Sequence, residues 1–143
     1  MLDSLNKRIR FLEEVIEKCE LKNISAIHGR AEEMAKKKEY REQFDLCVSR
    51  AVANLSSLSE YCLPYVKLNG MFISYKSSNI DMELQNAKKA IFLLGGEIKE
   101  TLRFQLTDDK GETMDRSLVV IEKKKTTPVK YPRKAGLPSK EPL

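Results

Sequence analysis

Short apolar segments alternate with helical segments along most of the chain, and this alternation limits the folds open to it. Segment 4–20 carries apolar residues at spacings of three and four, which predicts an amphipathic helix. Repeated strand–helix units predict a mostly parallel sheet, whose last two strands can close as an antiparallel hairpin. The expected fold class is therefore α/β. Further helices are expected at 31–38, 55–62 and 80–94, and strands at 24–28, 44–49, 71–75, 98–106 and 116–123.

Turn residues divide these segments. Asn69-Gly70 predicts a turn that leads into the strand at 71–75, and Gly95-Gly96 is expected to end the preceding helix. The chain also begins with a very short expected strand, Leu2-Asp3, which the first helix follows directly. An acidic residue at such a strand end is typical of nucleotide-binding α/β units, where its carboxylate accepts hydrogen bonds from ribose hydroxyls.

Composition excludes several classes of protein. The 143 residues suffice for one domain with a core, and 41% of them are hydrophobic and 33% charged. The sequence holds no apolar run near the roughly 20 residues that span a bilayer and no secretory segment, so we expect a cytoplasmic protein. Cys19, Cys47 and Cys62 are odd in number and widely spaced among apolar residues. We expect three buried thiols, rather than a disulfide framework or a zinc site.

Positive charge is concentrated at the C-terminal end of the sequence. Residues 124–143 hold six Lys/Arg and one acid, which leaves 20 basic and 20 acidic residues in 1–123. Four of the five prolines lie in the same segment. We therefore divide the chain into a folded part, 1–123, and a basic tail, 124–143, that should form neither helix nor sheet. An arm along RNA phosphates, contacted by Lys130, Arg133 and Lys134, is one interpretation, and a solubilising tail is the other.

Polar residues follow four expected strands, as a binding crevice requires. Ligands of open parallel sheets bind beyond the carboxyl ends of the strands, although strand ends are also polar simply because loops are. Gly29 to Glu32 place backbone N–H groups at a helix start, where they could meet an adenine edge. Arg50 requires an anion or a base edge, unless it is an ordinary surface arginine. The four ends are Asp3-Ser4, 28–32, Ser49-Arg50-Ala51 and Lys76-Ser77-Ser78.

Chemistry that depends on a nucleophile or a metal finds little support in the sequence. His28 is the single histidine, and neither a Ser/His/Asp nor a Cys/His set can be assembled around it. The histidine and cysteine spacing of a zinc deaminase is missing as well. The expected site thus holds no catalytic residue of these kinds and no metal.

Five motifs stand in order along the sequence: Leu2–Arg8, His28–Glu33, Phe44–Leu55, Arg116–Ile121 and Lys130–Gly136. Together they closely resemble the bacterial small-subunit rRNA methyltransferase G family, also called glucose-inhibited division protein B. The resemblance covers essentially the whole chain. It implies a Rossmann-like class I methyltransferase fold and S-adenosylmethionine as cofactor. The substrate it implies is N7 of a guanine in 16S rRNA, either as RNA or within the small-subunit particle.

The resemblance also implies roles for individual residues. Ala31 and Glu32 match the adenine end of the cofactor site, Arg50 the pocket after the next strand, and Asp3 the acid after the second strand. Lys76 matches a lysine on the acceptor side. Guanine N7 carries a lone pair and no proton, so no general base is expected, and catalysis would rest on alignment and desolvation.

The family's N-terminal helical segment, first strand and glycine-rich loop have no counterpart in this sequence. We therefore expect the C-terminal portion of a longer, monomeric enzyme that needs no membrane or metal. In class I methyltransferases the first strand lies between the strands that correspond here to Leu2-Asp3 and to 44–49. Without it those two strands would lose their shared neighbour and expose unpaired backbone and apolar faces, and the isolated chain should be unstable or self-associating. The alternative functions are a non-catalytic module that binds rRNA or the ribosome and a nicotinamide-dependent oxidoreductase.

Overall fold

The computed structural model describes residues 1–50, 53–77 and 80–143. Ala51, Val52 and Ser78, which belong to the motifs and strand ends above, lie outside the described residues. In chain order the elements are β1 (Leu2–Asp3), α1 (Asn6–Lys18), β2 (Ile27–His28), α2 (Ala31–Met34), β3 (Phe44–Ser49), α3 (Leu55–Cys62), a 3-10 turn (Leu63–Tyr65), β4 (Val66–Ser77), α4 (Asp81–Leu93), β5 (Gly96–Thr107), β6 (Thr113–Lys123) and α5 (Leu137–Lys140).

Within the described residues the strands form two sheets, β1–β2 and β3–β4–β6–β5. β1 and β2 are parallel, as are β3 and β4. β6 is antiparallel to both of its neighbours, so β3, β4 and β5 run in one direction and β6 runs in the other. The predicted α/β fold is confirmed, with its mostly parallel sheet and antiparallel terminal hairpin.

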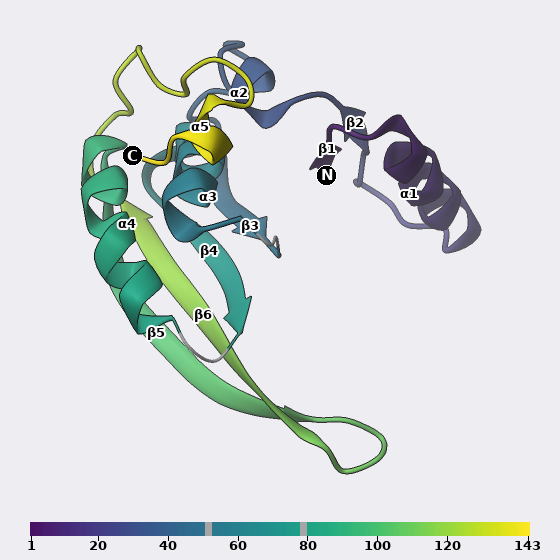
Figure 1. Ribbon diagram of the computed structural model, residues 1–143. Helices are drawn as coiled ribbons and strands as arrows, with labels where there is room; N and C mark the ends of the chain where they lie inside the picture. The colour runs from purple at the N-terminus through teal and green to yellow at the C-terminus, as the bar shows by residue number, and fades with distance from the viewer. Residues whose placement is uncertain (51–52, 78–79) are drawn as a thin grey trace.

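The core lies between the larger sheet and helices α3 and α4, which cover the same face (Figure 1). Cys47, Phe72 and Ile121 are register partners in successive strands, and all three contribute to this core. Side chains an odd number of positions away point to the opposite face: Val48, one position from Cys47, is 56% exposed, and Tyr75, three positions from Phe72, is 44% exposed. The larger sheet is therefore packed on one face and leaves apolar side chains open on the other.

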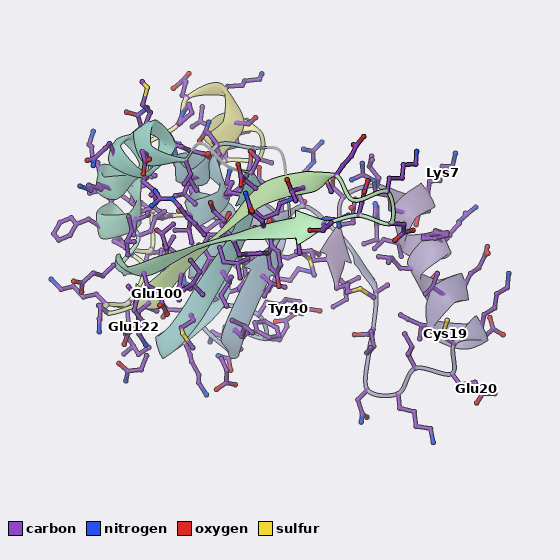
Figure 2. All side chains as sticks on the ribbon, turned by 90° about the horizontal axis from the view of Figure 1, so that it is seen from below. Lys7, Cys19, Glu20, Tyr40, Glu100 and Glu122 are labelled. Carbon is purple, nitrogen blue, oxygen red and sulfur yellow. The ribbon has the colours of Figure 1, made fainter. Side chains whose placement is uncertain are left out.

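A gap separates the two sheets. The unit formed by β1, α1 and β2 stands to one side of β3, joined to the body by the extended chain around α2 (Figure 1). Figure 2 shows Lys7, Cys19 and Glu20 of this unit far from Glu100 and Glu122 on the hairpin strands. Because β3 is the end strand of its sheet, it does not pair with β1 in the described structure. Among the described residues, β3 is therefore paired with β4 alone.

The interpretation of Asn69-Gly70 as a turn is wrong, because both residues lie inside β4. The chain accommodates them at an irregularity, where the pairing with β3 shifts register between Phe44 and Leu46. Asn69 takes a left-handed conformation, with φ +63°. Gly70 approaches β3 so closely that an added Cβ would lie 2.7 Å from the carbonyl oxygen of Asp45. A bulge therefore uses the residue types that a turn would use.

Residues 124–143 also differ from expectation, because the segment folds back over the body and ends in α5 (Figure 1). Tyr131 is only 6% exposed and belongs to the core. The expectation that this segment forms no helix is thus wrong. So is the expected burial of Cys19, which is exposed, whereas Cys62 is buried. Within the described residues, no helix is both long enough and apolar enough to cross a bilayer.

Candidate functional site

A cavity of about 890 Å³ lies between the β1–β2 unit and β3. It reaches the carboxyl ends of all three strands, where α/β sheets bind their ligands. Its size falls within the usual range for small-molecule sites. Residues from five parts of the chain line it, among them Asp3, Ala31, Glu32, Ser49, Tyr61, Cys62, Gly136 and Ser139.

Asp3 ends β1 and caps the start of α1. Its Oδ1 accepts a hydrogen bond of 2.8 Å from the backbone N–H of Leu5, and its Oδ2 lies 3.2 Å from the Arg8 guanidinium. The hydrogen bond from the Leu5 N–H is the main cause that lowers the pKa of Asp3; burial opposes it, and the Arg8 guanidinium lowers the pKa further. Asp3 is therefore an ionised acceptor at neutral pH, at the mouth of the cavity.

The start of α2 supplies the second wall. The Tyr65 hydroxyl donates to the carbonyl oxygen of Ala31 at 2.7 Å, which fixes the first turn of this short helix. Burial raises the pKa of Tyr65, so the hydroxyl stays protonated. Glu32 is 6% exposed, and its Oε1 accepts a hydrogen bond of 2.7 Å from the backbone N–H of Gly136. A nearly buried carboxylate thus faces the cavity with one oxygen held in place.

Three of the four expected cofactor residues, Asp3, Ala31 and Glu32, line this one cavity. Arg50 follows the end of β3 with an exposed side chain and is not among the lining residues. Lys76 lies elsewhere, because its Nζ donates to Glu83 Oε1 at 2.6 Å and to the carbonyl oxygen of Ala53 at 2.8 Å. The structure therefore brings together the two walls expected of a nucleoside site and places Lys76 in an internal ion pair.

The basic residues of the tail divide into two kinds. Lys130 and Lys134 are exposed, and Lys130 Nζ lies 5.2 Å from the ring centroid of Tyr131. Arg133 instead pairs with Glu60, whose side chain is fully buried in α3. Its backbone N–H and its guanidinium both bond to that carboxylate. Lys130 and Lys134 thus have the exposure that a phosphate contact needs, whereas Arg133 holds the tail to the body.

Sequence reasoning missed Glu60, and it missed the contribution of Gly136 and Ser139 to the cavity. Glu60 lies on a helix where seven of eight residues are buried, so no polar face marks it out. Its partner is 73 positions away. The buried neighbours of Arg133, Tyr131 and Pro132, are visible only in the structure, so the sequence contains no clear signal for this pair.

Of the two cysteines at the cavity, Cys62 is the one with little nucleophilic character. The neighbouring Cys47 thiol and burial raise the pKa of Cys62 well above its usual range, whereas the same neighbour lowers the pKa of Cys47. Within the described residues, no group of three or more His, Cys, Asp or Glu side chains is arranged to hold a metal ion. The lining combines the Asp3 and Glu32 carboxylates with the guanidinium groups of Arg8 and Arg30, hydroxyl groups and apolar side chains.

Comparison with solved structures defines the class of fold. A putative methyltransferase from Thermoplasma acidophilum matches with a TM-score of 0.65 at 9% identity, over 88% of this chain and 57% of that one. The TYW2 protein of M. jannaschii, solved in complex with AdoMet, matches with a TM-score of 0.61 at 12% identity, over 85% and 56% of the two chains. The fold is that of the Rossmann-like S-adenosylmethionine-dependent methyltransferases.

Sequence comparison then defines the family. The model of the family described as rRNA small subunit methyltransferase G matches residues 1–112. The relative from Clostridium tetani bearing the name ribosomal RNA small subunit methyltransferase G is 53% identical over the whole chain, which covers 59% of that relative. One from Lachnoclostridium phytofermentans is 55% identical, with 58% covered. The chain belongs to the rRNA small subunit methyltransferase G family, and it spans about three fifths of the length of these relatives.

Proposed function

We propose that the protein acts in methyl transfer from S-adenosylmethionine to N7 of a guanine in 16S rRNA, as part of a chain as long as its relatives. The observation that carries the proposal is the cavity in which the Asp3 carboxylate and the start of α2 face one ligand space. Membership of the family adds the class of reaction, and the names of the relatives add the class of RNA.

The residues at the cavity suit the nucleoside part of this cofactor. Asp3 is an ionised acceptor that can take hydrogen bonds from ribose hydroxyls. Glu32 can accept a hydrogen bond from the exocyclic amine of adenine, beside the N-terminal turn of α2 that begins at Ala31. We assign Arg50 to the cofactor pocket as well, because it follows the end of β3, although it does not line the cavity of this chain. The cofactor itself supplies an activated methyl group on a sulfonium.

A guanine N7 acceptor needs no base from the protein, because the attacking lone pair carries no proton. The chain's own residues would hold the two reactants in line and exclude water from between them. The cavity fits this requirement, because Met34, Leu58 and Cys62 give it apolar walls beside its polar groups. A positioning role, rather than proton transfer, is thus what this set of side chains can provide.

The RNA contacts are assigned by exposure. Lys130 and Lys134 present exposed ammonium groups on the surface of the tail and would meet phosphates. Lys76 is paired with Glu83, and Arg133 is paired with Glu60. We therefore assign Lys76 a structural role on the acceptor side of the site and Arg133 a structural role in anchoring the tail. The substrate is either 16S rRNA itself or the small-subunit particle.

The test uses the 143-residue chain and an extended form, in which the N-terminal segment of a full-length relative precedes it. Arg50→Ala in the extended form should abolish transfer of labelled methyl to 16S rRNA. Arg10→Ala, which removes an exposed arginine of α1, should leave transfer unchanged. Full activity of Arg50→Ala would refute the role assigned to Arg50. Calorimetry tests the reaction class, since failure of both forms to bind S-adenosylmethionine would leave a non-catalytic RNA-binding module.

A further inference from the structure

The C-terminal segment does more than cover the core, because two of its residues reach the ligand cavity. Gly136 and Ser139 line the cavity together with Tyr61 of α3 and Glu32 of α2. Both residues lie far from Glu32 in the sequence, and Gly136 is 104 positions away from it. The cavity wall on this side is therefore built by the segment that ends in α5.

The Glu60–Arg133 pair anchors that segment. Arg133 donates to Glu60 through its backbone N–H at 2.7 Å, through Nε at 3.0 Å to each oxygen, and through its terminal nitrogen at 2.7 Å. The Glu60 side chain is 0% exposed, so its charge depends on this partner. A fully buried carboxylate held in this way fixes the chain just before Gly136 with little freedom.

A second contact links this anchored segment to the cavity. Beyond Arg133 the chain turns through Gly136 at φ +82° and donates the Gly136 N–H to Glu32 Oε1 at 2.7 Å. The Ser57 hydroxyl then donates to the carbonyl oxygen of Pro138 at 2.6 Å, which holds the start of α5. The orientation of the Glu32 carboxylate is consequently set by the backbone of the C-terminal segment.

We infer that residues 133–139 form a wall of the cofactor pocket, with the Gly136 amide as the positioning group for Glu32 and Glu60–Arg133 as its anchor. This inference rests on the proposed function, because it assigns the nucleoside of S-adenosylmethionine as the ligand that Glu32 receives. Displacing the segment would turn the Glu32 carboxylate away from the ligand and open one side of the pocket. Cofactor affinity would then depend on residues that follow the last strand of the sheet.

Gly136 permits a sharp test, because the chain contains a matched control. Gly136 and Gly111 have φ +82° and +81°, and an added Cβ at either would have nothing within 4 Å. Alanine at each position is thus strained by its backbone conformation alone and to a similar extent. Gly111 lies in the loop between β5 and β6, at the far end of the hairpin from the body (Figure 1). The two substitutions should cost similar stability and differ only in their effect on the pocket.

The experiment measures S-adenosylmethionine affinity by calorimetry and the urea midpoint of Gly136→Ala, Gly136→Asn and Gly111→Ala, in the extended form and in the chain itself. Gly136→Ala should weaken S-adenosylmethionine binding about 5- to 10-fold, because an alanine at this position must adopt an unfavourable left-handed conformation to keep the pocket wall in place. Gly136→Asn should bind within about 2-fold of the original protein, because asparagine tolerates this conformation. Gly111→Ala should bind normally despite an equal loss of stability. In the extended form, KM for the cofactor should rise while kcat stays unchanged.

The outcomes separate the two proposals. If the unsubstituted protein binds S-adenosylmethionine and Gly136→Ala binds it equally well, the inference that residues 133–139 form a pocket wall is refuted and the proposed function stands. An equal loss of affinity in Gly111→Ala would likewise overturn the wall, because the effect would then follow stability alone. If neither form binds the cofactor, the proposed function fails and the wall fails with it.

Discussion

Replacing Arg133 with methionine should destabilise the protein far more than an ordinary arginine substitution. The change removes the guanidinium hydrogen bonds to Glu60, together with one of 2.7 Å to the carbonyl oxygen of Glu141. It leaves a carboxylate that is 0% exposed without its countercharge. Breaking a buried pair in this way costs about 3–5 kcal/mol. We expect the lower end, about 3 kcal/mol, because the backbone N–H of residue 133 still donates to Glu60.

Urea unfolding of the extended form, followed by circular dichroism, measures this cost, because the chain alone is expected to self-associate. With a slope of about 2 kcal/mol per molar urea, the midpoint should fall by about 1.5 M. Arg103→Met is the matched control, because Arg103 pairs with Asp81 on the surface, where the two side chains are 54% and 75% exposed. That loss should be about 0.5 kcal/mol or less. Adding Glu60→Gln to Arg133→Met should restore much of the stability by removing the buried charge. Equal midpoint shifts for Arg133→Met and Arg103→Met would refute the reasoning.

Three further predictions concern pH, RNA and association. The lowered pKa of Asp3 means that its stabilising contribution is present above about pH 4 and is lost as pH falls through that lowered pKa. The stability difference between the protein and Asp3→Asn should vanish below that range in a pH series of urea titrations, and a constant difference would contradict this. Replacing Lys130 and Lys134 with alanine should reduce the magnitude of the slope of log K against log salt for RNA binding by about 1.5–2 units. An unchanged slope would mean that the two lysines only keep the tail soluble. The chain alone should self-associate through its open sheet edge in sedimentation experiments, and Leu46→Lys with Val48→Lys should reduce this. A monomer that unfolds cooperatively would contradict the last prediction.

Local sequence signals predicted the regular elements well where neighbours in the chain determine them. The strand Phe44–Ser49 and the helix Leu55–Cys62 begin and end where expected. The strand is a mostly apolar run, and the helix starts after Asn54, whose side chain accepts a hydrogen bond from the Ser57 N–H. Strand β4 was predicted too short, because a bulge at Asn69-Gly70 uses the same residue types as a turn.

The site was harder to predict, since half of it depends on contacts between distant residues. Asp3, Ala31 and Glu32 could be named because strand ends and helix starts are visible in the sequence. The role of Gly136 could not, because a basic segment rich in proline resembles a disordered tail in composition. What folds it is the burial of Tyr131 and the pairing of Arg133, and both require partners from α3 and the sheet.

The anchor of the C-terminal segment has a consequence for synthesis on the ribosome. Arg133 is made 73 residues after Glu60. At about 5–20 residues per second this is an interval of about 4–15 s, in which the Glu60 carboxylate lacks its arginine. Helix α3 therefore cannot settle into its buried position at low cost until that interval ends. A polypeptide released before residue 133 would keep an unpaired charge at this position, and proteolysis would remove it in preference to the finished chain.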